Sequence, residues 1–265
     1  MARVLVTGSS DGLGRISARQ LLAQGHEVLL HARSPARARE ALAAVPGARV
    51  ALVGDLASVA ETRALALQAR AAGPLDAVIH NAGVGYRDGR VETADGLSRL
   101  FAVNVLAPYL LTALAPAPRL VYLTSGMHRG GDPDLSDLQW QRRPWDGSQA
   151  YSDSKLLDVV LAFAVARRWP GVRSNAVEPG WVPTRMGGPG APDDLEAGGR
   201  TQVWLSVSDD PAASVTGRCF FHQRQRPSHP AASVLEIQDG LLLACEALTG
   251  VALPSEPDLR RPAGG

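Results

Sequence analysis

A tyrosine and a lysine four residues apart are the side chains of this sequence best suited to acid–base chemistry. Lys155 is the only lysine among 27 basic residues, and it ends the segment Tyr151-Ser152-Asp153-Ser154-Lys155. Arginine replaces lysine readily on a surface, so a lysine that persists in an arginine-rich chain indicates a need for a compact ammonium group. On a helix, the spacing of four places both side chains on one face.

The same pair has enough electrostatic strength to work near neutral pH. An ammonium ~4–5 Å from a phenol, at an effective dielectric constant of ~20, favours the phenolate by about 3–4 kcal/mol. The sequence therefore predicts that Lys155 lowers the pKa of Tyr151 and that Tyr151 acts as a general acid or base. A packed tyrosine beside an exposed lysine is the alternative.

A glycine-rich turn, Thr7-Gly8-Ser9-Ser10-Asp11-Gly12-Leu13-Gly14, follows the first predicted strand. Glycines allow a tight turn and let backbone N–H groups approach a pyrophosphate. The helix after the turn offers its N-terminal dipole to the same anion. An ordinary strand–helix turn is the alternative, but the position between an N-terminal strand and a helix favours a dinucleotide site.

The end of the second predicted strand favours NADP(H) as the cofactor. It reads His31-Ala32-Arg33-Ser34-Pro35 and has no acidic residue where NAD-binding proteins hold the ribose 2′-OH. Arg33 offers two parallel donors to a 2′-phosphate. Ser34 and Pro35 predict the N-terminus of the next helix, aimed at the same anion. One residue of the glycine turn, Asp11, opposes this prediction.

Short aliphatic runs alternate with helical periodicities along the whole chain, which predicts βαβ units. Continuous apolar runs are typical of strands that are buried on both faces. We expect an α/β fold: one Rossmann-type doubly wound domain over residues 1–254, with a seven-stranded parallel sheet and helices on both faces. The predicted strands are 3–7, 27–32, 49–53, 75–80, 119–124, 172–177 and 218–222.

Three segments interrupt this rhythm. The polar insertion 127–149 is expected to form a flap near the site, and the Gly- and Pro-rich segment 185–200 is expected to be a loop that acts as a substrate lid. Residues 255–265 are expected to form a disordered tail.

The spacings TGxxxGxG and YxxxK resemble those of the short-chain dehydrogenase/reductase family. The resemblance continues in motifs after successive predicted strands, and the long insertion is similar to that of the retinol-dehydrogenase-like members. The motifs are Asp55-Leu56, Asn81-Ala82-Gly83, Asn104 in a long helix, Ser125, and Pro179-Gly180-Trp181-Val182-Pro183-Thr184. All three asparagines of the chain lie on or beside these motifs.

The resemblance implies an NADP(H)-dependent oxidoreductase that transfers a hydride between the nicotinamide and a carbonyl or alcohol substrate. Tyr151 would exchange a proton with the substrate oxygen, and Lys155 would also bind the ribose. Ser125 would stabilise the carbonyl oxygen, with Ser148 as a weaker alternative, and Asn104 would join Lys155 to solvent through a water. The implied cofactor contacts are Gly8, Ser10, Asp11, Gly12, Leu13, Gly14, Arg33, Asp55, Leu56, Asn81, Ala82, Gly83, Tyr151, Lys155, Pro179, Gly180, Val182 and Thr184.

Composition argues against several other kinds of protein. A net charge of +1 gives no reason to expect nucleic acid or an anionic membrane as a partner. No apolar stretch reaches the ~18 residues of a membrane span, and a strand that begins at Arg3 leaves no room for a signal peptide. A cytoplasmic protein is therefore expected. No spacing of His, Cys or carboxylates predicts a metal site. His128, His222 and His229 are expected to have no partner, and His80 is expected to be structural.

The substrate and the assembly are the least determined features. Trp140, Trp145 and Trp181 favour an apolar or aromatic carbonyl compound. The resemblance implies a homodimer or homotetramer, unless the insertion blocks the contact between subunits. The alternatives are a non-catalytic NADP(H)-binding scaffold or redox sensor, and an epimerase or dehydratase, for which the glycine spacing and the short C-terminal region are unfavourable.

Overall fold

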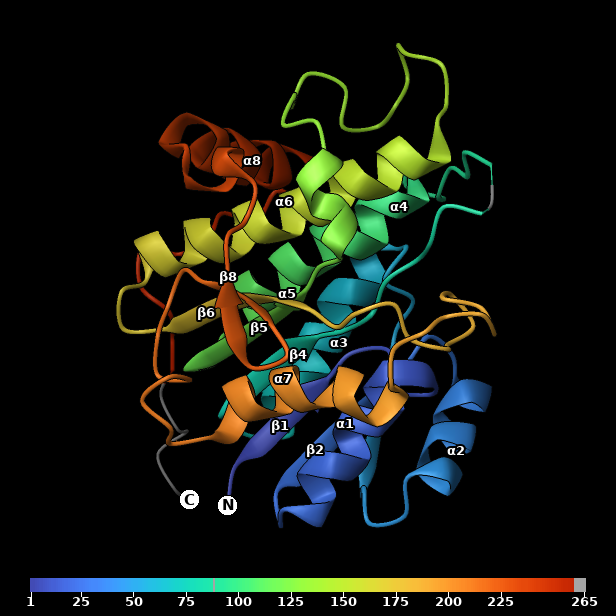
Figure 1. Ribbon diagram of the computed structural model, residues 1–265, viewed down its shortest axis with the longest axis vertical. Coiled ribbons are helices and arrows are strands. Elements are labelled where there is room, and N and C mark those ends of the chain that lie inside the picture. Colours follow the sequence, from blue (N-terminus) through green and yellow to red (C-terminus); the bar gives the residue numbers. More distant parts are fainter. Residues whose placement is uncertain (88, 260–265) are drawn as a thin grey trace.

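Eight strands form one sheet in the order β3-β2-β1-β4-β5-β6-β7-β8 (Figure 1). The computed structural model describes residues 1–87 and 89–259. Each neighbouring pair is parallel except β7 and β8, which are antiparallel. The strands are β1 (Arg3–Val6), β2 (Glu27–Ala32), β3 (Val50–Val53), β4 (Ala77–His80), β5 (Arg119–Leu123), β6 (Arg173–Glu178), β7 (Cys219–Phe221) and β8 (Arg224–Arg226).

The predicted doubly wound fold is confirmed, but the prediction of seven strands is wrong by one. The additional strand β8 follows a two-residue turn in which His222 and Gln223 have φ of 48° and 60°. Tight hairpins require positive φ at these two positions, usually supplied by Asn-Gly. The strand itself reads Arg-Gln-Arg and is fully exposed, so neither its turn nor its composition carries an ordinary strand signal.

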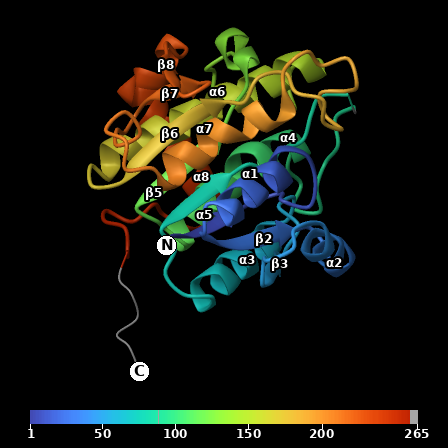
Figure 2. The same ribbon diagram turned by 60° about the horizontal axis from the view of Figure 1, so that its bottom comes forward.

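Helices cover both faces of the sheet, and consecutive strand residues contribute to opposite cores (Figures 1 and 2). α1, α2 and α7 pack on one face, and α3, α5 and α6 on the other, with α8 packed against α6. The helices are α1 (Gly12–Ala23), α2 (Pro35–Ala44), α3 (Val59–Ala71), α4 (Arg99–Phe101), a π-helical turn (Ala102–Leu106), α5 (Ala107–Leu114), α6 (Gly147–Arg168), α7 (Leu195–Val207) and α8 (Leu235–Thr249), with 3₁₀ turns at Gly126–Gly130 and Pro230–Ser233.

The loop predicted over residues 185–200 ends earlier than expected, because α7 begins at Leu195. Asp194 caps this helix by accepting a hydrogen bond from the Ala197 N–H at 2.7 Å. Gly198 and Gly199 lie inside the helix, where a Cβ atom would come within 2.8 Å of Val182 and of Ile16, respectively. These glycines permit close packing of α7 on α1, so a pair of residues taken as a loop signal has a helical role.

A buried carboxylate within the insertion 127–149 organises its backbone. Asp137 accepts hydrogen bonds from the N–H groups of Gln141, Arg142 and Arg143 at 2.8, 3.1 and 3.3 Å. Arg143 in turn lies over the Trp140 ring, 3.7 Å from its centroid. Whether the insertion acts as a flap stays a prediction.

Part of the predicted tail is placed, because Asp258 pairs with Arg70 at 3.2 Å. The remainder of that prediction, 260–265, lies outside the described residues. Among the helices that the structure describes, none is long and apolar enough to cross a membrane.

Candidate active site

The glycine turn between β1 and α1 is fixed from three sides. The Gly8 N–H donates to His31 Nδ1 at 2.9 Å, and His31 Nε2 pairs with the Gly54 carbonyl at 2.9 Å. Nδ1 therefore accepts and Nε2 carries the proton, so His31 is neutral; burial lowers its pKa. Asn81 holds the turn from β4, donating to the carbonyls of Thr7 and Gly8 at 2.8 and 3.2 Å.

Two glycines of this turn have no room for a side chain. Gly8 has φ of +63°, and a Cβ there would lie 2.9 Å from the Ala82 Cα atom. At Gly14 a Cβ would lie 2.4 Å from the Gly8 carbonyl oxygen. The third glycine, Gly12, has φ of +51° and faces Thr184 across the turn. The turn therefore keeps its backbone bare at the start of α1, where a phosphate binds most favourably.

Tyr151 and Lys155 lie on one face of α6, as their spacing predicts. Both are buried, with 7% and 5% of their surface exposed, and Lys155 Nζ is 5.9 Å from the centre of the Tyr151 ring. The Tyr151 hydroxyl faces Met186, with Sδ 3.8 Å away. The alternative of an exposed lysine is wrong.

The ammonium of Lys155 is already engaged by the protein. Nζ donates to the Leu123 carbonyl at 2.8 Å and to Asp158 Oδ2 at 2.7 Å. Burial alone would lower the lysine pKa, but Asp158 and Tyr151 reverse this effect, so the pKa of Lys155 lies above its ordinary value. Burial raises the pKa of Asp158 to about 6, against the opposing influence of Lys155.

Asn104 lies in the π-helical turn between α4 and α5, an irregularity often found at functional sites. Its side chain accepts from the Val84 N–H at 2.8 Å and donates to the Val84 carbonyl at 3.1 Å and to Ser154 Oγ at 3.0 Å. A Cβ placed on Gly83 would lie 3.4 Å from Asn104 Oδ1 and 3.6 Å from Lys155 Nζ. The structure thus brings Gly83, Asn104 and Lys155 together.

Ser125 ends the segment after β5, as predicted, but its hydroxyl is engaged locally. Oγ accepts from the Met127 N–H at 3.3 Å and caps the 3₁₀ turn Gly126–Gly130. Within residues 1–87 and 89–259, no hydrogen bond joins Ser125 to Tyr151.

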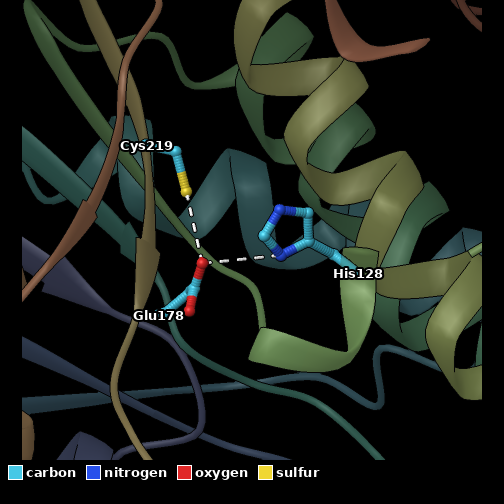
Figure 3. Close-up of side chains that lie close together, drawn as sticks. All are labelled: His128, Glu178 and Cys219. Atoms are coloured by element: carbon cyan, nitrogen blue, oxygen red, sulfur yellow. Dashed lines mark hydrogen bonds and ion pairs between the residues drawn. The ribbon is translucent and has the colours of Figure 1, made fainter. Parts of the chain in front are cut away.

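His128 has partners, so the prediction that it stands alone is wrong. Figure 3 shows it beside Glu178 and Cys219, with Nδ1 and Sγ 3.7 and 3.9 Å from Glu178 Oε1. Nδ1 also pairs with the Ser125 carbonyl at 2.7 Å. Arg129 binds both carboxylate oxygens of Glu178, at 2.5 and 3.1 Å, and supplies the positive charge that a cation would bring. The cluster therefore joins the Ser125 turn to the end of β6.

His80, His222 and His229 remain outside this site. Burial lowers the pKa of His80 to about 3, and its ring stacks on Tyr122 at 4.6 Å. His222 stacks on Phe221, with ring centres 4.0 Å apart, and His229 accepts from the Ala231 N–H at 3.1 Å.

At the end of β2, the structure engages a different arginine from the predicted one. Ser34 caps α2 and Pro35 begins it, as predicted. Arg33 is exposed, whereas Arg37, one turn into α2, donates to Ser10 Oγ at 3.1 Å and to Asp11 Oδ2 at 2.7 Å. The signal for Arg37 was its position three residues after the capping serine.

The segment after β6 returns to the glycine turn. Gly180 has φ of +90°, and Asp193 accepts from the Trp181 N–H at 2.6 Å. Val182 is buried, and Thr184 lies against Gly12, so Pro179–Thr184 borders the turn as the motif predicts. Asp55 and Leu56 follow β3: Asp55 accepts from the Ala57 N–H at 2.9 Å, and the Leu56 side chain is buried in the core.

The fold and this geometry define a Rossmann-type protein with a glycine turn at the start of α1 and a buried Tyr–Lys pair. The family model described as short chain dehydrogenase matches residues 2–127. An uncharacterised oxidoreductase of Emericella nidulans is 44% identical over 260 residues, which cover 96% of this chain and 99% of that protein. Short-chain dehydrogenase chyC of Penicillium rubens is also 44% identical over 260 residues, covering 96% and 100%. The chain belongs to the short-chain dehydrogenase family of oxidoreductases.

More distant relatives and solved structures agree with this assignment. Retinol dehydrogenase 13 of Homo sapiens is 30% identical over 287 residues, covering 95% of this chain and 86% of that protein. The crystal structure of an uncharacterised protein from Mycobacterium paratuberculosis has a TM-score of 0.82 at 25% identity, with 96% and 95% of the two chains covered. A blue fluorescent protein from a metagenomic library, solved in complex with NADPH, has a TM-score of 0.67 at 24% identity, with 83% and 95% covered, and shows the shared fold alone.

Proposed function

We propose that the protein is an NADP(H)-dependent oxidoreductase that interconverts a carbonyl compound and its alcohol. One observation carries this proposal. The ammonium group of the only lysine is buried beside Gly83, 5.9 Å from the centre of the Tyr151 ring. A scaffold or sensor that only binds the cofactor has no need for a buried charge next to a tyrosine hydroxyl.

The residues present fit a bound dinucleotide. Because Gly83 has no side chain, a ligand can approach Asn104 and Lys155 there. The bare turn 8–14 and the start of α1 would hold the pyrophosphate, and Lys155 and Tyr151 would hold the nicotinamide ribose. The cofactor supplies the hydride when it is bound.

The protein's own part is to hold and move a proton. In reduction, the Tyr151 hydroxyl would donate its proton to the substrate oxygen, at the position that Met186 Sδ occupies here. The charge on Lys155 stabilises the phenolate that remains. Ser125 would turn its hydroxyl from the Met127 N–H to the substrate oxygen.

The preference for NADP(H) is supported by the Arg37–Asp11 ion pair. At the sequence level Asp11 opposes binding of a 2′-phosphate. Arg37 neutralises that carboxylate at 2.7 Å, while exposed Arg33 remains available at the end of β2. Arg37 also pairs with Glu40 at 2.5 Å, so two guanidinium groups and two carboxylates balance at this corner, and Arg33 is the guanidinium left to meet a 2′-phosphate.

The surroundings of the Tyr151 hydroxyl favour an apolar or aromatic substrate. The Tyr86 ring lies 5.4 Å from that of Tyr151, and Met186 Sδ is 3.8 Å from its hydroxyl. Met127 and Trp145 pack against the apolar cluster that contains Tyr151. Tyr86 and Met186 are each 41% exposed, so both are accessible from solvent. We propose that residues 185–194 act as the lid, which has to withdraw Met186 before a carbonyl group reaches Tyr151.

Oxidation of NADPH with a panel of aromatic ketones and aldehydes tests the proposal. Tyr151→Phe removes only the hydroxyl and should reduce kcat/KM by about 100-fold or more. Tyr86→Phe, a matched change at the neighbouring ring, should alter kcat/KM by less than about threefold. Full turnover by Tyr151→Phe would refute the mechanism, and NADPH binding without turnover of any carbonyl compound would favour the scaffold.

A further inference from the structure

Asp158 is a buried carboxylate to which the proposed function assigns no role. It lies three residues after Lys155, within the otherwise apolar run Leu156–Ala162 of α6. Its side chain is 3% exposed, and Oδ2 is 2.7 Å from Lys155 Nζ. A buried carboxylate without a partner destabilises a fold by several kcal/mol, so this ion pair has to be maintained as a unit.

The pair fixes where the ammonium can point. A lysine has three N–H donors. One goes to the Leu123 carbonyl at the end of β5 and one to Asp158, which leaves a single donor for a ligand. The position of Nζ, 3.6 Å from where a Gly83 Cβ would stand, is set by these two bonds.

We propose that Asp158 is a positioning residue for the Tyr151–Lys155 pair, whose carboxylate keeps the ammonium charged and holds it beside Gly83. This inference rests on the proposed function only where it concerns activity. Its electrostatic part concerns the protein without cofactor or substrate.

The groups that face the pair come from three elements. Tyr151 lies on α6 itself, Tyr122 comes from β5, and His80 on β4 stacks against Tyr122. Burial raises the pKa of Tyr122, and burial lowers the pKa of His80 to about 3, so both rings are neutral near pH 7. Asp158 therefore contributes more than Tyr151 to opposing the effect of burial on the Lys155 pKa.

The single lysine allows a direct test. A protein labelled with ¹³Cε-lysine and carrying a lysine-free tag shows one side-chain resonance, which reports the protonation of Nζ. In the wild-type protein this resonance should not titrate below pH 10, and it should show a small step near pH 6, where Asp158 gains its proton. In Asp158→Asn the lysine titration should move down by about one pH unit or more, because burial then acts without the opposing charge of Asp158.

Matched variants separate the pairing from a general effect of burial. Asp153→Asn removes another buried carboxylate of α6, one that binds Arg143 at 2.8 Å, and should leave the lysine titration unchanged. Asp158→Glu keeps the charge and should restore most of the wild-type titration. An unchanged lysine titration in Asp158→Asn would overturn the proposal. If that variant does not fold, the wild-type protein decides: a lysine resonance that titrates below pH 10 would overturn the proposal.

Activity provides a second readout. The pH at which kcat/KM declines on the alkaline side should fall in Asp158→Asn by about as much as the pH of the lysine titration. It should return toward the wild-type value in Asp158→Glu. If the lysine titration moves while the activity limit does not, the Asp158–Lys155 pairing stands and the catalytic role of Lys155 fails. If neither moves, the pairing itself is refuted.

Discussion

Replacement of Gly14 by alanine should disrupt the glycine turn more than any other single methyl group added to it. A Cβ at this position would lie 2.4 Å from the Gly8 carbonyl oxygen and 2.5 Å from Asn81 Nδ2. Neither atom can move freely. The Gly8 N–H is held by His31 at 2.9 Å, and Asn81 is held by the Thr7 and Gly8 carbonyls.

The expected cost follows from these contacts. Overpacking of a tight site costs about 1–3 kcal/mol, and the loss of the two Asn81 hydrogen bonds costs about 1 kcal/mol each. The sum is about 3–5 kcal/mol of unfolding free energy. At roughly 2–4 °C per kcal/mol for a large single domain, Tm should fall by about 6–20 °C.

Thermal and urea unfolding of the protein without cofactor measure this cost, and titration with NADPH measures the state of the turn. Gly171→Ala is the matched control, because a Cβ there meets nothing within 4 Å; its Tm should stay within about 1–2 °C of the wild-type value. A Gly14→Ala protein that melts within 2 °C of wild type would show that the turn has another way to accommodate a side chain.

Three further predictions concern single side chains. Lys155→Arg should lower kcat/KM by about 100-fold while the protein remains folded, because a planar guanidinium cannot replace a buried ammonium bonded to Leu123 and Asp158. His80 is buried and neutral with a pKa of about 3, and it binds a proton more readily in the unfolded chain. Lowering the pH from 7 to 5 should therefore reduce the free energy of unfolding by about 2 kcal/mol through this residue. Arg37→Ala leaves Asp11 unpaired and should lower the preference for NADPH over NADH by about tenfold, measured as the ratio of kcat/KM values.

Each of these has its own control and its own contrary outcome. Wild-type turnover by Lys155→Arg would remove the reason for the single lysine. His80→Asn should flatten the acid side of the stability curve in urea unfolding; an unchanged slope would place the loss in other groups. Arg39 is an exposed arginine of the same helix, and Arg39→Ala should leave the ratio of kcat/KM values for NADPH and NADH unchanged. An unchanged ratio in Arg37→Ala would mean that Arg33 alone binds the 2′-phosphate.

Most of the fold and the Tyr151–Lys155 pair at the centre of the site could be predicted from short stretches of sequence. Short, mostly apolar runs mark seven strands of three to six residues, since both faces of a parallel sheet are buried. The glycine turn and the Tyr151–Lys155 spacing depend on positions a few residues apart, so they can be recognised without knowledge of the fold. The lone lysine carries the strongest signal, because an arginine-rich composition made its presence informative.

Only the tertiary structure decided which distant groups these residues meet. Asp158 reads as one charge in an apolar run until burial on α6 places it against Lys155. Arg37 reads as one arginine of many until the end of β2 brings α2 beside Asp11. Gly198 and Gly199 read as a loop until α7 packs on α1. For Arg37 and for the two glycines, the deciding quantity is a distance between segments far apart in the sequence, and packing sets that distance. Asp158 is only three residues from Lys155, so there the deciding quantity is the burial of the helix face that both residues share.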